Sequence, residues 1–490
     1  MLEKSQKFVS DVSVTFAASA SQAVLAFVIT VILGKWVGAE ELGLYRMAIT
    51  IYGIIILLAA IGIPSAIIKY VAEFRDNKDK INELVSCSII IVLFSGIVFS
   101  ALFFSLSGII ADIFKMPQLR ELVKILSVIF PFALINSTLL GLLNGYREMK
   151  KYATVIIIRG ILTVVITTTL ILYYDFGARG AAIGLTLSEI LSCFFLIWIS
   201  RRYFKLVFRG FFLTAASLSK FGVQILGADA INTLNKQLDI ILIGLFLLPS
   251  DVGYYAAAAS LSRFFWLIPS SIQRITYPAT SEYWGKQNLI ALNSMINKSI
   301  KYSSLILVFI GLGVFFFGNY IMVSLFREDF AISFVPLQIL LIGTVIRGGI
   351  AQPIGASLTG IGRPDLVLKL TTFMLMINAL FDLLLIPRIG ITGAAIATSI
   401  SLSSGAIVNL VLVAKKMFVK IDVGWFLKLL GIAIASIALF KIGIHFINPY
   451  LLGSILLGSC LFFMLTLLLT KEDRIALKSL PSLFLARKYV

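Results

Sequence analysis

Residues 85–107 read VSCSIIIVLFSGIVFSALFFSLS and contain no Asp, Glu, Lys or Arg. A helix needs roughly 20 apolar residues to cross the hydrocarbon core of a bilayer, and this stretch is long enough. Similar runs recur along the chain, in which 59% of the 490 residues are hydrophobic and 13% are charged, against about 25% charged in soluble domains. We therefore expect an all-α integral membrane protein with about 14 transmembrane helices, at residues 11–34, 44–66, 85–107, 122–145, 152–174, 178–200, 219–248, 254–276, 302–325, 334–358, 370–387, 392–414, 429–447 and 450–470.

The positions of the basic residues predict the orientation of these helices. Lys and Arg in alternate loops number 28 on one side and 7 on the other. Because cytoplasmic loops carry the excess of Lys and Arg, we expect both termini in the cytoplasm and a multi-pass protein of the cytoplasmic membrane. The net charge of +18 lies in short clusters between apolar runs, so it reflects topology and predicts no nucleic-acid partner.

Two pairs of similar segments indicate an internal repeat. GKWVGAEELGLY at 34–45 matches GLFLLPSDVGYY at 244–255 with an offset of 210, and GARGAAI at 177–183 matches GITGAAI at 390–396 with an offset of 213. The repeat predicts a six-helix lobe at 1–200, a cytoplasmic linker at 201–218, a second six-helix lobe at 219–414, and two additional helices with a tail at 415–490. Lobes that start on the same side are related by an axis along the membrane normal, which favours a cavity between them and alternating access.

Polar residues inside two repeat-related spans form stripes. Asp229, Asn232, Lys236 and Asp239 are spaced 3, 4 and 3 residues apart, which places them on one helical face. The repeat offset aligns Ser19 with Asp229 and Gln22 with Asn232. These stripes either line a substrate cavity or hold helices together through hydrogen bonds.

Ionisable residues at membrane depth are functional candidates because burying their charge is unfavourable. The guanidinium group of arginine forms bidentate hydrogen bonds to phosphate oxygens and keeps its charge in a low dielectric. Arg263 and Arg347, together with Lys236, therefore suit a lipid pyrophosphate head group. The alternative is ion pairing with Asp229, Asp239 or Glu189. The central-cavity candidates are Ser19, Gln22, Asp229, Asn232, Lys236, Arg263, Arg347, Glu189 and Arg159.

Other charged residues within the predicted membrane spans allow more than one interpretation. Arg159 and Glu189 could pair with each other within the first lobe. Asp239 and Asp382, near the outer ends of their helices, suit either structural capping or coupling to a cation. Arg46, at the outer edge of the second span, is expected to anchor that interface. Bends are expected at Gly348-Gly349, Pro131, Pro269 and Pro353.

The order and spacing of several motifs resemble one family over essentially the whole chain. They are the segment at 34–45, DIILIG at 239–244 followed by VGYY at 252–255, and Asn378 and Asp382 before Ile386-Pro387 and GITGAAI at 390–396. The arrangement resembles the polysaccharide-exporter (Wzx-like) branch of the multidrug/oligosaccharidyl-lipid/polysaccharide (MOP) flippase superfamily. The resemblance implies flipping of polyprenyl-(pyro)phosphate-linked oligosaccharide from the cytoplasmic to the outer leaflet. In some relatives a Na⁺ or H⁺ gradient drives the cycle, and no other cofactor or metal is expected.

Three alternatives remain beside this interpretation. A lipid II or sporulation-type flippase belongs to the same class, and a multidrug and toxin extrusion-like exporter would carry organic cations, although the basic residues at membrane depth favour an anionic head group. An integral-membrane enzyme would need a sizeable external loop or a nucleotide-binding glycine loop, and the chain has one histidine, so we expect no enzyme and no catalytic residues. The expected partners are membrane lipids, the lipid-linked glycan and polysaccharide-assembly enzymes, with the protein itself a monomer.

Overall fold

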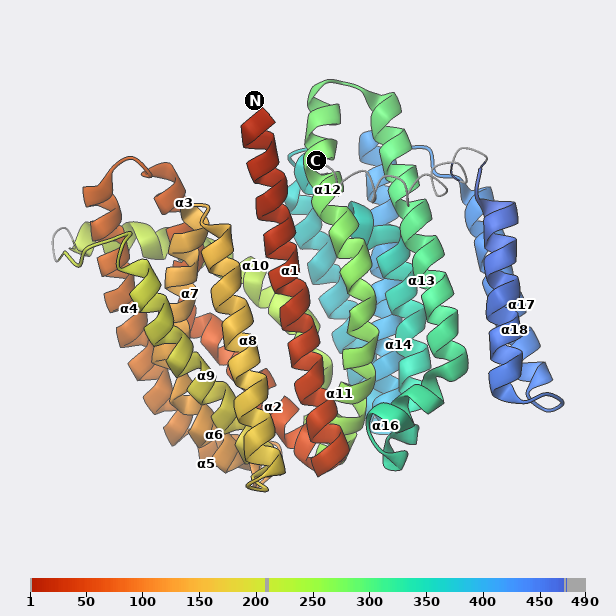
Figure 1. The fold of residues 1–490 in the computed structure, drawn as a ribbon, viewed down its shortest axis with the longest axis horizontal. Coiled ribbons are helices and arrows are strands. Elements are labelled where there is room, and N and C mark those ends of the chain that lie inside the picture. The colour runs from red at the N-terminus through yellow and green to blue at the C-terminus, as the bar shows by residue number, and fades with distance from the viewer. Residues whose placement is uncertain (1, 208–210, 471–472, 474–490) are drawn as a thin grey trace, which may run out of the picture. The chain divides into compact units, whose positions relative to one another are not determined.

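The computed structural model describes residues 2–207, 211–470 and 473, and within these ranges it consists of helices and loops without a β-strand (Figure 1). The predicted all-α fold is confirmed. The first part of the chain forms α1 (Leu2–Ile32), η1 (Leu33–Val37), α2 (Ala39–Ala60), α3 (Ile63–Glu73), α4 (Lys78–Ser105), α5 (Ser107–Ile113), α6 (Leu119–Ser127), α7 (Ile129–Gly145), α8 (Met149–Leu172) and α9 (Gly177–Ser200). The rest forms α10 (Phe211–Phe246), α11 (Pro249–Arg263), η2 (Phe264–Trp266), α12 (Leu267–Gly285), α13 (Leu289–Leu325), η3 (Glu328–Ser333), α14 (Phe334–Ile346), η4 (Arg347–Ala351), η5 (Gln352–Ile354), α15 (Ser357–Gly360), α16 (Pro364–Met417), α17 (Val423–Gly443), α18 (Pro449–Phe463) and η6 (Met464–Leu468).

Helix length and hydropathy identify ten helices among the described residues that are able to cross a membrane, or up to eleven if the bent pair α6 and α7 is one span. Every predicted interval is helical, but the count of 14 is not confirmed. The segment α16 covers two predicted spans. The backbone leaves helical geometry at Ile389 and Gly390 and divides the segment between them. The helix α10 and the pair α11 and α12 are not among the candidates; the charged residues of α10 lower its hydropathy.

The expected bends coincide with breaks between helical segments. Pro131 lies in the first turn of α7, and α6 and α7 meet at an angle of 49°. Pro269 lies in the first turn of α12, just after the 3₁₀ turn η2. Gly348 and Gly349 lie in the π-helical segment η4, and Pro353 lies in the 3₁₀ turn η5. Proline removes a backbone donor and π-turns interrupt the regular ladder, so bends form where these residues occur.

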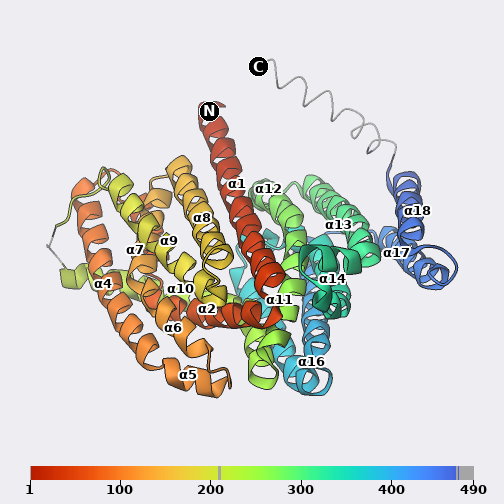
Figure 2. The same ribbon diagram turned by 60° about the horizontal axis from the view of Figure 1, so that its bottom comes forward.

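The chain divides into two compact units, and the first contains residues 1–267, 322–340 and 368–401. Within this unit α8 packs against α1 and α9, α4 packs against α7, and α2 packs against α11 (Figure 2). The ring of Phe130 lies 5.3 Å from that of Tyr52 and 5.4 Å from that of Phe103, both in edge-to-face geometry. Because lipid tails are as apolar as these rings, close packing rather than exclusion of water holds such helices together.

The helices α2 and α11 cross at two glycines that are equivalent in the predicted repeat. A Cβ atom on Gly43 would clash with the carbonyl group of Pro249, and one on Gly253 would clash with the carbonyl group of Ala39. Ala39 and Pro249 are themselves separated by the repeat offset of 210. A reciprocal contact of this kind is what a two-fold relation between repeats would produce, while the lobe boundaries at 200 and 219 stay a prediction.

The second unit contains residues 268–321, 341–367 and 402–490. The helices α17 and α18 lie side by side (Figure 1). A hydrophobic cluster that includes Phe316, Leu429 and Leu456 joins α13 to this pair. A second cluster joins the start of α13 to α15 and the end of α16, through Ile296, Leu358 and Val413. The side chains of Asp422 and Asn448 accept backbone hydrogen bonds at the starts of α17 and α18, which fixes where these helices begin.

Candidate substrate and ion site

Two carboxylates from different helices of the first unit lie together in a buried polar cluster. Asn378 Nδ2 donates to Asp239 Oδ1 at 2.7 Å and to Asp382 Oδ2 at 2.5 Å. The other oxygen of Asp239 accepts hydrogen bonds from the hydroxyl groups of Tyr255 and, at 2.7 Å, Thr398. The cluster therefore joins α10, α11 and both halves of α16. We call these five residues the acidic cluster.

The charge balance of the acidic cluster is incomplete. Asp382 is 0% exposed, and its Oδ1 atom is buried without a hydrogen-bond partner. Neither carboxylate forms an ion pair with a basic residue in the part of the chain that the structure describes. Two ionised carboxylates that share one amide nitrogen repel each other strongly in a low dielectric. An arrangement of oxygen atoms with one unpaired carboxylate oxygen fits a proton or a small monovalent cation.

The sequence identified Asp239 and Asp382 separately, as either capping or ion-coupling residues. The structure brings the two together and adds Tyr255, Asn378 and Thr398. Asn378 and Tyr255 occur in the motifs quoted for the family resemblance, and Asn378 precedes Asp382 by one helical turn. That spacing was the available signal for Asn378, whereas nothing in the sequence places Thr398 near Asp239.

Arg263 of α11 connects two other basic residues of the first unit, Arg46 of α2 and Lys236 of α10. Arg263 Nη2 donates to the backbone oxygen of Lys236 at 3.2 Å, and both side chains are exposed. Arg46 lies close enough to Arg263 to be repelled by it, and Arg46 Nε is buried without a hydrogen-bond partner. We call Arg46, Lys236 and Arg263 the basic cluster.

The basic cluster forms no close ion pair with an acidic side chain in the described ranges, but Lys236 is near enough to Asp229 to attract its carboxylate. The role of Lys236 and Arg263 as cavity residues therefore stays a prediction. Arg46 was expected to anchor an interface, and its buried, unpaired Nε atom adds it to the candidates. Like charges gathered in this way leave the site able to accept an anion.

Arg159 and Glu189 form the pair that the sequence offered as an alternative. Arg159 Nη1 lies 3.0 Å from Glu189 Oε1, and the two side chains are 22% and 10% exposed. Asn136 Nδ2 donates to the second carboxylate oxygen at 2.7 Å and to the backbone oxygen of Glu189 at 3.0 Å. Arg159 is thus paired with Glu189, and Glu189 is also bonded to Asn136 of α7.

The remaining stripe residues lie on faces that the protein leaves uncovered. Ser19, Gln22 and Asn232 are exposed, and Asp229 is half-buried. Polar side chains at membrane depth avoid lipid, so their exposure fits a water-filled space, and the cavity itself stays a prediction. Arg347 begins η4 in the second unit, where it is half-buried.

No three His, Cys, Asp or Glu side chains come together in the described residues. The acidic cluster contributes two carboxylates, fewer than the ligands of a closed transition-metal site.

Comparison with known proteins identifies a matching family and several similar proteins. The model of the polysaccharide biosynthesis protein family matches residues 8–284, more than half of the chain. The probable low-salt glycan biosynthesis flippase of Haloferax volcanii is 28% identical over 191 residues, 38% of this chain and 40% of that protein. Stage V sporulation protein B of Bacillus subtilis is 27% identical over 200 residues, 39% of this chain and 38% of that protein. The alignments thus span about two fifths of the length of these two relatives.

A solved structure extends the similarity to the whole fold. The lipid II flippase MurJ in an inward closed conformation superposes with a TM-score of 0.76 at 18% identity, covering 92% of this chain and 98% of that one. At this level of identity the match establishes the fold alone.

Proposed function

The chain belongs to the family of polysaccharide biosynthesis proteins, and we propose that it carries a polyprenyl-(pyro)phosphate-linked oligosaccharide from the cytoplasmic to the outer leaflet of the cell membrane. The similarity to a glycan biosynthesis flippase and the fold shared with a lipid II flippase support this assignment. In this proposal the protein is a transporter rather than an enzyme. Its termini lie in the cytoplasm, as the distribution of basic residues predicts.

The observation that carries the proposal is the basic cluster. Three cations at membrane depth, two of them arginines that repel each other, would be unfavourable without a counter-ion. A pyrophosphate presents several oxygen atoms to which arginine forks bind in pairs. Arg46 and Arg263 therefore hold the pyrophosphate of the lipid carrier, and Lys236 contributes a third positive charge.

The acidic cluster supplies the energy coupling in this proposal. A Na⁺ ion or a proton neutralises one of the two negative charges of Asp239 and Asp382, and Asn378 and Thr398 orient the carboxylates. Binding of the ion stabilises the conformation in which α10, α11 and α16 meet, and its release favours the other one. A cation gradient can then drive the cycle, because the ion binds the two states with different affinity.

The test is a flipping assay with fluorescent lipid-linked oligosaccharide in reconstituted vesicles. Arg263→Ala and Arg46→Ala should each reduce flipping at least ten-fold, since one charge-assisted hydrogen bond to phosphate is worth about 1.5–3 kcal/mol, while both variants insert normally. Arg363→Ala is the matched control, because this exposed arginine pairs with Asp365 at 2.9 Å outside the cluster. Undiminished flipping by both cluster variants would refute the assignment of the pyrophosphate site.

Two further measurements address the cavity and the ion. Cysteines at positions 19, 22, 229 and 232 should react with aqueous reagents in at least one conformation, and complete protection of all four positions would exclude a cavity there. Asp382→Asn should abolish the dependence of flipping on a Na⁺ or H⁺ gradient. A gradient dependence equal to that of the wild type would remove the acidic cluster from the coupling.

A lipid II or sporulation-type substrate is the second candidate, and the similarity to a sporulation protein favours it over an organic cation. Mass spectrometry of the lipid-linked intermediate that accumulates in a flippase-deficient strain, before and after rescue, separates these substrates. A multidrug exporter would instead show export of organic cations by the same vesicles. Association with polysaccharide-assembly enzymes and a monomeric state stay predictions.

A further inference from the structure

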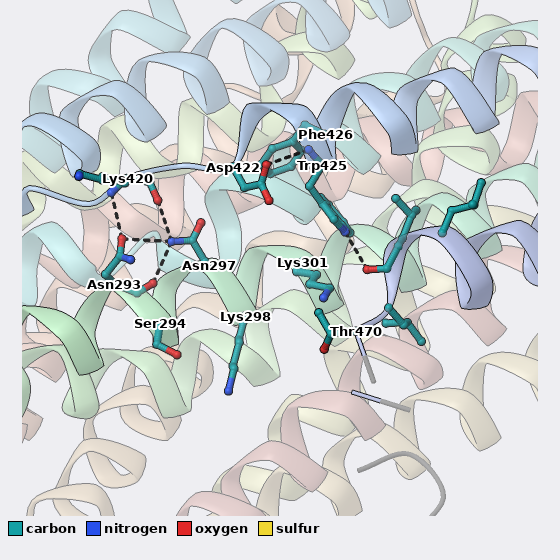
Figure 3. A pocket seen from close by; sticks show the side chains of 13 residues that line it. Asn293, Ser294, Asn297, Lys298, Lys301, Lys420, Asp422, Trp425, Phe426 and Thr470 are labelled. Carbon is teal, nitrogen blue, oxygen red and sulfur yellow. Dashed lines mark hydrogen bonds between the residues drawn. The ribbon is translucent and has the colours of Figure 1, made fainter. Parts of the chain in front are cut away.

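A cavity of about 530 Å³ lies in the second unit, and none of its lining residues belongs to the two clusters described above. It is lined by one face of α13, by the segment between α16 and α17, and by the end of η6 (Figure 3). The distribution of Lys and Arg assigns these helix ends and this connecting segment to the cytoplasmic side. The cavity therefore lies at the predicted cytoplasmic surface of the membrane.

The walls of the cavity differ in chemistry. Asn293, Ser294, Asn297, Lys298 and Lys301 form the polar wall along α13 (Figure 3). Trp425, Phe426 and Leu467–Leu469 form the apolar wall. A cavity that is polar on one side and apolar on the other suits an amphiphile, and Trp is typical of the boundary between head groups and lipid tails.

The backbone around the cavity is fixed by hydrogen bonds. Asn293 Oδ1 accepts from the backbone nitrogen of Lys420 at 2.9 Å, and Asn297 Nδ2 donates to the backbone oxygen of Lys420 at 2.9 Å. The indole nitrogen of Trp425 donates to the backbone oxygen of Leu468 at 3.0 Å. The cavity is thus a built feature of the fold, because side chains of α13 and α17 tie its three walls together.

Two of the three lysines that line the cavity, Lys298 and Lys420, form no ion pair with any residue that the structure describes. Lys301 is bound by Asp473 at 2.5 Å, and the carboxylate of Asp422 accepts from the backbone nitrogen of Trp425 at 3.0 Å. The ammonium group of Lys298 is exposed and forms neither a hydrogen bond nor an ion pair with any residue that the structure describes. Lys420 adds a further positive charge at the rim. The lining therefore carries three lysines against one carboxylate.

We propose that this cavity binds the phosphate-bearing head group of an anionic membrane lipid from the cytoplasmic leaflet. Lys298 contacts the phosphate, the hydroxyl group of Ser294 donates to one of its oxygen atoms, and the upper parts of the lipid chains lie against Trp425, Phe426 and Leu467. Basic pockets between membrane helices on the cytoplasmic side are suited to such head groups. The occupant is a lipid rather than free phosphate, because the apolar wall would otherwise face water.

The position of Trp425 allows a direct test. In the full-length chain Trp36, Trp198, Trp266 and Trp284 are replaced by Phe, which leaves Trp425 as the only indole. The protein is reconstituted in vesicles that contain equal fractions of phosphatidylglycerol and phosphatidylcholine, with brominated chains on one or the other lipid. Brominated phosphatidylglycerol should quench Trp425 more strongly than brominated phosphatidylcholine.

Charge variants connect this preference to the proposed contact. Lys298→Gln should reduce the preference for phosphatidylglycerol about five-fold, as expected for the loss of one lysine near a charged membrane surface. Lys286→Gln is the control with the same change of charge, because Lys286 lies outside the cavity and pairs with Glu282 at 2.6 Å. It should keep the preference of the parent protein.

Three results would overturn the proposal: equal quenching by the two lipids, an unchanged preference in Lys298→Gln, or loss of the preference when millimolar inorganic phosphate is added. The last result would show that the site binds free phosphate. If the protein with one tryptophan does not fold, native mass spectrometry of the chain with all five tryptophans measures which lipid it retains and tests the same proposal. Retention of phosphatidylglycerol over phosphatidylcholine should then fall about five-fold in Lys298→Gln, and equal retention in both proteins would contradict the proposal.

Discussion

Replacement of Glu189 by Gln tests whether the ion pair with Arg159 is structural. At the observed 3.0 Å, the attraction between unit charges is ~5.5 kcal/mol for an effective dielectric constant of about 20. Removal of one partner of a buried pair lowers stability by about 3–5 kcal/mol, since it leaves the other charge uncompensated. Arg159 is 22% exposed and lies near the predicted cytoplasmic end of α8, so its charge can reach water. We therefore expect a loss near the lower end, about 3 kcal/mol.

The measurement is a double-mutant cycle with Arg159→Gln, Glu189→Gln and the combined variant, unfolded by sodium dodecyl sulfate in mixed micelles. Each single change should lower the free energy of unfolding by about 3 kcal/mol, and the combined change by much less than the sum. Arg179 and Glu121 provide the control, because they lie closer, at 2.6 Å, but are 61% and 53% exposed. Their coupling should be below about 1 kcal/mol.

Additive losses in the combined variant of Arg159 and Glu189 would refute this reasoning, and equal coupling in the two pairs would show that burial is not what matters. The flipping assay adds a separate readout. If the combined variant is stable and flips normally, Arg159 does not contact substrate. A stable variant that does not flip would return Arg159 to the substrate site.

Three further predictions concern other parts of the chain. Gly253→Ala should lower the free energy of unfolding by about 1–3 kcal/mol, because its methyl group would meet the carbonyl of Ala39, whereas Gly227→Ala, with open space around it, should have little effect; equal midpoints of denaturation would contradict the close crossing. Gly390→Ala should cost about 1–3 kcal/mol in the same assay, since φ is +62° at the break in α16, and an unchanged midpoint would argue against this backbone conformation. Burial raises the pKa of Asp473, but hydrogen bonds from Lys301, Tyr302 and Thr470 outweigh it and hold that pKa well below its usual range. Asp473 therefore stabilises the protein above pH ~4 and this contribution is lost as the pH falls further, so Asp473→Asn should be less stable than the wild type at pH 7 and approach it in acid; a difference that is the same at both pH values would exclude this role.

The sequence predicted the helices well because a bilayer allows few alternatives. Backbone groups inside lipid must pair within the segment, so a run such as 85–107 could only become a helix, and α4 covers nearly all of it. Helical breaks were harder, although proline and glycine marked several. The break at Ile389 and Gly390 lies where the repeat segment GITGAAI begins, between the predicted spans 370–387 and 392–414.

The site was predictable only where its members share one helix. Spacing along α10 placed Asp229, Asn232, Lys236 and Asp239 on one face, and this required no knowledge of tertiary structure. The contacts of Asp239 with Tyr255 and Thr398 span 16 and 159 positions in the sequence, and no periodicity within one element encodes such distances. Arg46 was missed for the same reason, since its proximity to Arg263 arises from the packing of α2 on α11.

The acidic and basic clusters share α10 and α11, which gives a physical reason to expect coupling between them. Lys236 and Asp239 lie one helical turn apart on α10, and Arg263 and Tyr255, both on α11, bind the backbone of the first and the side chain of the second. The hydrogen bond between Arg263 of α11 and the backbone of Lys236 on α10 positions Arg263. An ion that moves Asp239 would move α10 directly and α11 through Tyr255, and so would change both partners of this hydrogen bond. If the ion and the substrate favour the same conformation, their coupling is positive and reciprocal, so substrate should tighten ion binding by the factor by which the ion tightens substrate binding. Tyr255→Phe removes the hydrogen bond to Asp239 while keeping the ring, and it should reduce this mutual factor more than it reduces either affinity alone. Equal factors in Tyr255→Phe and the wild type would mean that the ion signal does not pass along α11.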